Sequence, residues 1–335
     1  MNIETASAER AATPASVQGA EPAPAVETRG LTRLYRGVAA LEEVTLDIRE
    51  NAITGLLGRN GAGKTTLMSL ITAQDRPSSG TVRVRGRDPF EHAATIEQMC
   101  FVRDNQRYPD DYKLKHAMRA AAIFYPNWSQ ELADRLVDLF RIPVKPVVKK
   151  FSRGQLSALG IVLGLASRSP ITFFDEPYLG LDATARHIFY DELLRDYAEH
   201  PRTIILSTHL IDEMDRLLER VIVLDRGRVL RHADVDELRG GAFQVAGRAS
   251  AVDEFARDRR TLSRRAIGGL GTAVVEGALS DGDRAAASAA GLEISAVSLQ
   301  DLVAAYGLGD AAGSADPAPG DPHRPASQLS GRSAS

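Results

Sequence analysis

The hydrophobic and polar positions divide the chain into a long, regularly patterned middle part and two ends without such patterns. Residues 28 to about 240 carry short apolar runs that alternate with segments of helical periodicity. This alternation predicts a mainly parallel sheet flanked by helices. No internal repeat is evident, so we expect one α/β domain over residues 28–240 and no second copy of it.

One stretch of this middle part is richer in helical patterns. Four apolar side chains recur there at helical spacing, namely Leu132, Leu136, Leu139 and Phe140. This spacing predicts an apolar stripe that faces a core. We therefore expect a helical subdomain over about residues 108–168.

The segment 241–306 has shorter and more mixed elements. Strands are expected at residues 243–246, 272–276 and 292–297, and helices at residues 252–259, 281–290 and 299–306. This mixture predicts a small α+β accessory domain.

The two ends of the chain contain few large apolar residues. Residues 1–27 are rich in Ala, Pro and Glu, and residues 307–335 in Gly, Ala, Ser and Pro. Both compositions predict disorder. The N-terminus shows no basic segment followed by an apolar run, so no secretory signal is expected.

Charge, cysteine content and hydropathy narrow the classes of function. The net charge is -3 with 25% charged residues, so charge alone does not indicate a polyanion-binding protein. A single cysteine, Cys100, excludes an intramolecular disulfide and fits a reducing cytoplasm. The longest apolar stretch, at residues 156–166, falls below the ~20 residues that span a bilayer. We expect a soluble chain whose role at a membrane, if it has one, depends on a partner.

The strongest motif is the segment Gly-Arg-Asn-Gly-Ala-Gly-Lys-Thr-Thr at residues 58–66. Apolar runs precede and follow it, which gives the strand–loop–helix context of a phosphate-binding P-loop. Its glycines allow backbone N–H groups to surround phosphate oxygens at a helix N-terminus. Lys64 would reach the β- and γ-phosphates of ATP, and the Thr65 hydroxyl would bind Mg²⁺. The alternative is a glycine-rich turn that only connects strand and helix. The expected nucleotide contacts are Gly58, Asn60, Gly61, Ala62, Gly63, Lys64, Thr65 and Thr66.

A second element of the same site lies at residues 171–176. Four largely apolar residues predict a buried strand, and Asp175 follows at its carboxyl end, where α/β sheets bind ligands. Asp175 would hold Mg²⁺, and Glu176 would orient or deprotonate the attacking water. Alone, an apolar strand that ends in Asp-Glu is more often structural. Together with the P-loop it predicts a metal site and a general base.

Further motifs follow in the order found in the ABC ATPase superfamily, which the chain resembles over about residues 28–235. Tyr35 matches the aromatic residue that stacks on adenine ahead of the P-loop. The peptide Phe-Ser-Arg-Gly-Gln at residues 151–155 looks like the family's signature, usually Leu-Ser-Gly-Gly-Gln. Residues 178–182 resemble the D-loop, and His209 matches the switch histidine that contacts the γ-phosphate. A lone histidine at a strand end is more often structural, but this order of motifs favours the catalytic role.

The resemblance implies a P-loop fold of the ABC ATPase type, with a mainly parallel core sheet, an N-terminal antiparallel β part and a helical subdomain. In this family two nucleotide domains meet head to tail, so the P-loop of one subunit and the signature of the other hold each ATP. Ser152 and the backbone of Gly154 would donate to the γ-phosphate in the partner's site. Gln155 and Asp182 belong to the same expected set of nucleotide contacts. Closure and opening of this dimer would drive attached membrane subunits.

Two positions depart from the family pattern. Arg153 stands where the signature usually has glycine, and it either adds a charged contact or weakens the site offered to the partner. The slot of the family's Q-loop glutamine aligns with Asp104, whereas Gln106 lies two residues later. We expect Gln106 to contact the nucleotide and Mg²⁺. The other interpretation is that Asp104 and Gln106 are both solvated loop residues.

Four shorter segments resemble one subgroup, the ATPase subunits of ABC-2-type exporters that often accompany GntR-type regulators. They are Tyr-Pro-Asn-Trp at residues 125–128, the Phe-Ser-Arg-Gly-Gln form of the signature at 151–155, Asp-Glu-Pro-Tyr-Leu-Gly at 175–180, and the ending at 297–303. The resemblance implies an ATPase that binds integral membrane subunits and a second nucleotide-binding subunit at the cytoplasmic face of the membrane. No nucleic acid partner is expected.

Two other functions stay open at this stage. The first is an ABC-type ATPase that acts on nucleic acid or ribosomes. The lack of long heptad segments, the single P-loop and the acidic charge balance all weigh against it. The second is a catalytically weak subunit of a heterodimeric transporter, which Arg153 in the signature suggests.

Overall fold

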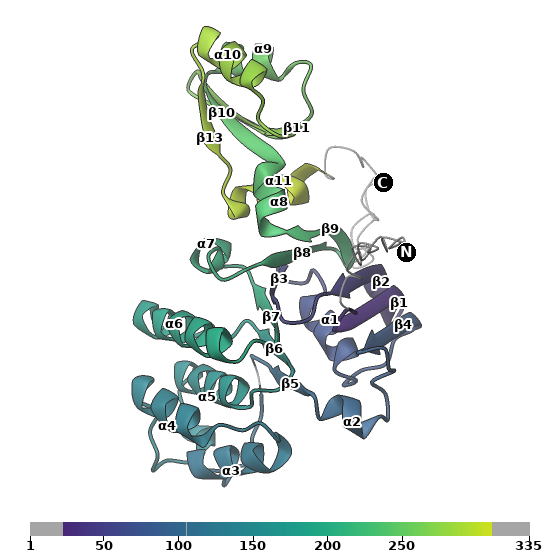
Figure 1. Cartoon of the computed structure of the whole chain (residues 1–335), viewed down its shortest axis with the longest axis vertical. Coiled ribbons are helices and arrows are strands. Elements are labelled where there is room, and N and C mark those ends of the chain that lie inside the picture. Colours follow the sequence, from purple (N-terminus) through teal and green to yellow (C-terminus); the bar gives the residue numbers. More distant parts are fainter. Residues whose placement is uncertain (1–22, 105, 310–335) are drawn as a thin grey trace, which may run out of the picture.

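The computed structural model describes residues 23–104 and 106–309. Its central feature is a six-stranded sheet of order β5-β6-β7-β3-β8-β9, in which β5, β6, β7, β3 and β8 are parallel and β9 is antiparallel (Figure 1). Its strands are β3 (Ile53–Leu57), β5 (Met99–Val102), β6 (Ile171–Asp175), β7 (Thr203–Thr208), β8 (Arg220–Asp225) and β9 (Arg228–Asp234). The mainly parallel sheet predicted from the sequence is confirmed.

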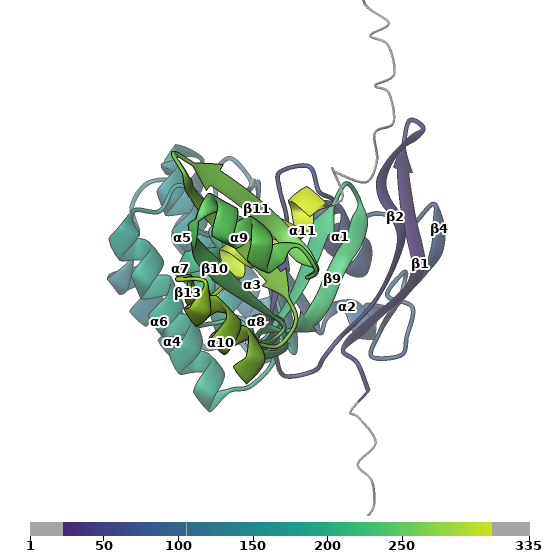
Figure 2. The same cartoon turned by 90° about the horizontal axis from the view of Figure 1, so that it is seen from above.

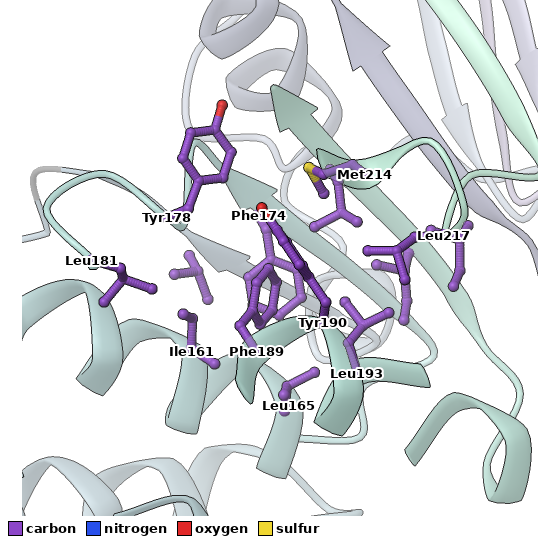
Figure 3. Packing of buried hydrophobic residues seen from close by; sticks show 14 of the residues in the cluster. Ile161, Leu165, Phe174, Tyr178, Leu181, Phe189, Tyr190, Leu193, Met214 and Leu217 are labelled. Atoms are coloured by element: carbon purple, nitrogen blue, oxygen red, sulfur yellow. The ribbon is translucent and has the colours of Figure 1, made fainter. Parts of the chain in front are cut away.

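Every residue of β3, β6 and β7 is buried, as expected for strands in the middle of a sheet covered on both faces. Apolar side chains of the flanking helices pack against the sheet. Figure 3 shows Phe174 of β6 beside Phe189 of a flanking helix, and the two rings meet edge to face with centroids 5.6 Å apart. The helices that follow the sheet strands are α1 (Lys64–Ile71), α6 (Ala183–Glu199) and α7 (Ile211–Met214).

A separate antiparallel sheet of order β2-β1-β4 packs beside α1. Its strands are β1 (Val26–Tyr35), β2 (Val38–Ile48) and β4 (Ser79–Val84), and a short helix α2 (Ala93–Ile96) follows. The first strand begins inside the segment 1–27 that we predicted to be disordered. That boundary was wrong by a few residues because Ala25 and Val26 are fully buried and the Ala25 N–H donates to the Ile48 carbonyl at 2.8 Å. Residues 1–22 of the predicted lead lie outside the described residues.

The predicted helical subdomain contains the elements α3 (Leu114–Phe124), α4 (Gln130–Leu139), η1 (Val148–Lys150) and α5 (Arg153–Ala166). They form one end of the molecule in Figure 1. Leu132 and Leu136 of α4 are buried, as the helical spacing predicts. Leu139 is 39% exposed instead, because it lies in the last turn of the helix, away from α5.

The C-terminal part forms a second antiparallel sheet of order β11-β12-β10-β13 at the opposite end of the molecule (Figures 1 and 2). Its elements are α8 (Val235–Gly240), β10 (Ala242–Arg248), α9 (Ala249–Ala256), β11 (Thr261–Ile267), β12 (Leu270–Glu276), α10 (Asp281–Ala289), β13 (Glu293–Ala296) and α11 (Leu299–Gly309). The helices α9 and α10 cover one face of this sheet and share a small core with it, which includes Phe243, Val245 and Phe255. An α+β appendage is therefore present, although the strand β11 was not predicted.

The last helix, α11, does not share the small core of the appendage. It contacts α7, α8 and β11, and its fully buried Leu299 and Leu302 belong to the main core of the molecule. A boundary drawn at residue 241 from sequence order therefore separates α11 from two of the elements against which it packs, α7 and α8. The predicted tail 307–335 starts within α11, and residues 310–335 lie outside the described residues.

Within residues 23–104 and 106–309, no helix combines the length and apolar content that a membrane span requires.

Candidate nucleotide-binding site

The carboxyl ends of three neighbouring strands bring the main motifs together. In the sheet, β3 lies beside β7, and β7 lies beside β6. The P-loop follows β3, Asp175 ends β6, and His209 follows β7. Because parallel strands end at the same edge, residues more than a hundred positions apart in the sequence meet in one site.

The P-loop depends on glycine at two positions where backbone segments approach closely. A Cβ at Gly58 would lie 2.3 Å from the Leu224 carbonyl oxygen. At Gly63, which precedes α1 with φ of 105°, a Cβ would lie 2.7 Å from the carbonyl oxygen of Ala40. Glycine is therefore required for the loop to wrap tightly around the start of α1.

A pocket opens over this loop. Ten residues line it, namely Ala40, Asn60, Gly61, Ala62, Gly63, Lys64, Thr65, Thr66, Asp175 and Glu176. Seven of the eight expected P-loop contacts thus face one pocket together with both acidic residues. Gly58 lies at the base of the loop instead, where its carbonyl accepts a hydrogen bond from Lys64.

The side chains of the P-loop and of the acidic pair are directly bonded. Lys64 Nζ donates to the Gly58 carbonyl at 2.7 Å and lies 3.3 Å from Glu176 Oε1. The Thr65 hydroxyl donates to Asp175 Oδ2 at 2.7 Å, and the Ser207 hydroxyl donates to Asp175 Oδ1 at the same distance. Lys64 is only 6% exposed, so its charge is held in a largely buried network.

The donor set beside α1 fits Mg²⁺. The Thr65 hydroxyl and the Asp175 carboxylate place two hard oxygen atoms next to each other at the floor of the pocket. Mg²⁺ in phosphate sites uses one or two such protein oxygens and takes the rest of its shell from phosphates and water. The described part of the chain contains no cluster of three or more His, Cys, Asp or Glu side chains suited to a metal.

Glu176 occupies a constrained position between Lys64 and His209. Its backbone has φ of +50°, and its N–H donates to the Ser207 hydroxyl at 2.9 Å. Its Oε2 lies 2.8 Å from His209 Nδ1, while Oε1 is buried without a hydrogen-bond partner among the described residues. One oxygen of this carboxylate is thus held, and the other faces Lys64.

Comparison with known proteins decides the family. The family model described as ABC transporter matches residues 41–179. The ABC transporter ATP-binding protein YcbN of Bacillus subtilis is 32% identical over 226 residues, covering 64% of this chain and 71% of that protein. The chain belongs to the ABC transporter ATP-binding proteins. It is an ATPase, the ATP-binding subunit of an ABC transporter.

Two further relatives agree with this assignment. The daunorubicin/doxorubicin resistance ATP-binding protein DrrA of Streptomyces peucetius is 29% identical over 225 residues, covering 65% of this ABC ATPase and 68% of DrrA. A solved structure of the ATP-binding subunit of an ABC transporter superposes with a TM-score of 0.58 at 26% identity. It covers 64% of this chain and 91% of the other. The P-loop fold of the ABC ATPase type is therefore confirmed.

The signature of this ABC ATPase begins α5. Ser152 caps the helix, since its hydroxyl accepts from the Gln155 N–H at 3.2 Å and the Gln155 side chain accepts from the Ser152 N–H at 3.0 Å. A Cβ at Gly154 would lie 2.5 Å from the Gly180 carbonyl, so the signature packs tightly against the D-loop of the same subunit. Ser152, Gly154 and Gln155 do not line the pocket over the P-loop.

The two departures from the family pattern contact each other. Arg153 Nη2 lies 3.1 Å from Asp104 Oδ2, which joins the signature to the segment after β5. Gln106 lines a cavity together with Asp175 and Glu176. Asp104 lines the same cavity and also contacts Arg153, so the geometry brings both Asp104 and Gln106 toward the acidic pair.

Tyr35 and Asp182 lie outside the pocket over the P-loop. Tyr35 ends β1, where its hydroxyl donates to Asp75 and the Arg33 guanidinium covers its ring at 4.5 Å. The ring is 43% exposed. Asp182 caps α6 and accepts from the Ala185 N–H at 2.8 Å. This hydrogen bond gives Asp182 a structural role as a helix cap that does not involve a nucleotide.

Sequence analysis missed two side chains of the site. Ser207 bonds both the Asp175 carboxylate and the Glu176 N–H. Tyr178 bonds Glu176 and His209. The available signal was their position, two residues before His209 and two residues after Glu176, but hydroxyls in such segments are common and carry no distinctive spacing.

Proposed function

We propose that this chain is the ATP-hydrolysing subunit of an ABC exporter and works as a dimer beneath separate membrane subunits. The observation that carries the proposal is the convergence of Lys64, Asp175, Glu176 and His209 at one edge of the sheet. This set offers a cation for phosphate, oxygen ligands for a metal, and a carboxylate held by an imidazole.

We assign each residue one task in hydrolysis. Lys64 binds the β- and γ-phosphates, for which it leaves the Gly58 carbonyl. Thr65 and Asp175 hold Mg²⁺, which supplies charge neutralisation at the phosphates when bound. Glu176 accepts the proton of the attacking water, with Gln106 nearby as a further contact. His209 fixes Glu176 from one side and contacts the γ-phosphate from the other.

The proposed dimer follows from the place of the signature. Ser152 and Gly154 begin a helix of the helical subdomain and lie outside the pocket of their own P-loop. A helix N-terminus offers donors to an anion. In a head-to-tail dimer, that anion would be the γ-phosphate of the ATP bound to the P-loop of the second subunit. Proteins of this family dimerise and pair with membrane subunits, which agrees with this arrangement.

Export is proposed from the relatives. DrrA of Streptomyces peucetius is named a daunorubicin/doxorubicin resistance ATP-binding protein, and we infer a role in export for this chain from its likeness to that protein. We accordingly place this chain at the cytoplasmic face of the membrane, bound through integral membrane subunits. No nucleic acid partner is proposed.

Two variants separate ATP binding from hydrolysis. Glu176→Gln is expected to bind ATP with unchanged affinity and to lower turnover by about 100-fold or more, because it removes the proton acceptor. It should also trap an ATP-bound dimer in size-exclusion chromatography. Lys64→Ala should lose ATP affinity by about 10-fold or more, because a charged phosphate contact is removed. Glu199→Gln and Lys115→Ala, both at exposed positions, are the matched controls.

Unchanged turnover in Glu176→Gln would show that Glu176 is not the general base.

The membrane partner is tested by purification of the tagged chain from detergent extracts. A polytopic membrane protein should be captured with it. Capture of RNA or ribosomes in its place would refute the transporter assignment.

A further inference from the structure

Tyr178 lies at the junction between the acidic pair and the switch histidine. It is only 2% exposed, and its ring packs edge-on against the His209 ring with centroids 5.7 Å apart. Figure 3 shows the hydroxyl at the end of the ring that points away from the apolar cluster around Phe174 and Phe189. The ring is thus held by the core while the hydroxyl reaches the site.

The hydroxyl of Tyr178 lies within hydrogen-bond distance of three groups of the site, the third being His209 Nδ1 at 3.3 Å. It donates to Glu176 Oε2, and it accepts from the backbone N–H of His209 at 2.9 Å. Nδ1 of His209 lies 2.8 Å from the same carboxylate oxygen. One oxygen of Glu176 is therefore fixed by two residues on neighbouring segments of the site.

The other oxygen of the carboxylate remains available. Oε1 of Glu176 is buried, faces Lys64 Nζ at 3.3 Å and has no hydrogen-bond partner among the described residues. A general base needs one lone pair directed at the water that it deprotonates. Fixing Oε2 turns Oε1 toward the pocket lined by the P-loop.

Burial and the neighbouring Glu176 charge raise the pKa of Tyr178 well above its ordinary value of 10.0. The hydroxyl therefore keeps its proton at neutral pH. Two acceptors lie within its reach, Glu176 Oε2 and His209 Nδ1 at 3.3 Å, and the nearer carboxylate oxygen takes the proton in the hydrogen bond.

We propose that Tyr178 is a positioning residue for hydrolysis: its hydroxyl links the Glu176 carboxylate to the switch histidine and orients the free oxygen toward the attacking water. The proposal rests on the proposed role of Glu176 as the base. Tyr178 does not line the pocket over the P-loop, so it acts through Glu176.

Tyr178→Phe tests this role because it removes one oxygen atom and keeps the ring that packs in the core. We expect kcat for ATP hydrolysis to fall about tenfold or more, the strength of one hydrogen bond to a charged group. KM and the Kd for ATP should stay within about twofold, because the P-loop is untouched. The unchanged Kd also reports that the variant is folded.

Tyr190→Phe is the matched control. Tyr190 is 6% exposed, packs in the same core and donates its hydroxyl to Glu213 at 3.3 Å, away from the acidic pair. Its variant should keep the kcat of the original chain. An equal loss of kcat in both variants would mean that the effect is one of general packing and would overturn the proposal.

A double-variant cycle shows whether Tyr178 acts through Glu176. In the Glu176→Gln background, Tyr178→Phe should cause no further loss of kcat, because the group that it orients is gone. Full additivity would contradict the proposal, and so would normal kcat in Tyr178→Phe alone. Normal kcat in Glu176→Gln would instead refute the proposed base, so the two failures are distinguishable.

Discussion

The polar residues of the site are held by one another before any substrate enters. Asp175 accepts hydrogen bonds from Thr65 and Ser207 on its two oxygens, and Glu176 lies between Lys64 and His209. Each of these groups is largely buried or flanks a buried one, where an unpartnered charge is costly. The network therefore positions the side chains in advance, which is the condition for electrostatic catalysis.

Sequence patterns pointed to the P-loop, the acidic pair and His209 but not to how these residues are bonded, and they did not point to Ser207 and Tyr178. The P-loop and the acidic pair have fixed spacings along the chain, so their types and positions were readable. The contact between Arg153 and Asp104 joins residues 49 positions apart, and neither departure from the family pattern reveals the other. Such pairing depends on how the loop after β5 approaches α5.

His232 on β9 gives a prediction for the dependence of stability on pH. Burial, together with the nearby Arg220 charge, lowers the pKa of His232 below its ordinary value of 6.5. As the pH falls below about 6.5, the unfolded chain binds a proton before the folded chain does, so the folded state loses stability. Above that pH both states are neutral and no loss occurs.

The expected result is a steeper fall of the midpoint of thermal unfolding between pH 7.5 and 5.5 in the original chain than in His232→Gln. Differential scanning fluorimetry measures it. His187→Gln, on the outer part of α6, is the control and should follow the original chain. Parallel curves for all three proteins would count against the role of His232.

At the scale of elements, the start of α5 and the D-loop are packed backbone to backbone. Gly154 and Gly180 approach so closely that a side chain on either would meet the other segment, and the Ser157 hydroxyl bonds the Leu179 carbonyl. The signature is therefore not a free loop. A displacement of α5 is passed to the residues that follow the acidic pair.

Gly154→Ala should disturb this contact. Its Cβ would lie 2.5 Å from the Gly180 carbonyl, and relief requires a shift of one backbone segment. Overpacking of this kind costs about 1–3 kcal/mol, so the midpoint of thermal unfolding and the rate of ATP turnover should both fall. Gly240→Ala is the control, since a Cβ at Gly240 in α8 meets no atom within 4 Å. That variant should be as stable as the original chain or slightly more so. Equal stability of the two variants would show that the start of α5 and the segment at Gly180 can move apart at little cost in free energy.

The elements themselves were predicted with uneven success, and the reason is physical. Strands such as β6 are buried over their whole length and show as apolar runs. The strand β11 has no buried residue, and its position is set by pairing with β12. A strand defined by a neighbour rather than by its own burial leaves little pattern in the sequence.

At the scale of the whole molecule, one core joins parts that are distant in the sequence. The main cluster contains Phe174 and Leu206 from the central sheet and also Leu299 and Leu302 from α11. The sequence predicted the helix near residues 299–306. It could not predict where that helix docks, because its contacts lie on α7, α8 and β11, which come from two different parts of the chain.

Leu302→Ala should destabilise the molecule by about 2–5 kcal/mol, since it removes a fully buried side chain and leaves a cavity. Urea denaturation monitored by circular dichroism measures this loss. Leu270→Ala, at a position that is 67% exposed, is the control and should change stability by less than about 0.5 kcal/mol. If both variants unfold at the same urea concentration, α11 contributes nothing to the main core.

The docking of α11 has a consequence for how the protein is made. A ribosome releases the chain from the N-terminus, so the P-loop, the signature and the switch histidine all emerge before α11 does. Until residues 299–302 appear, the apolar surfaces of α7 and α8 stay uncovered. The nucleotide-binding part therefore completes its core only after the four-stranded sheet of the appendage has emerged. A nascent chain that is stalled before residue 299 has left the ribosome should be more sensitive to protease than one that is stalled after residue 309 has left it.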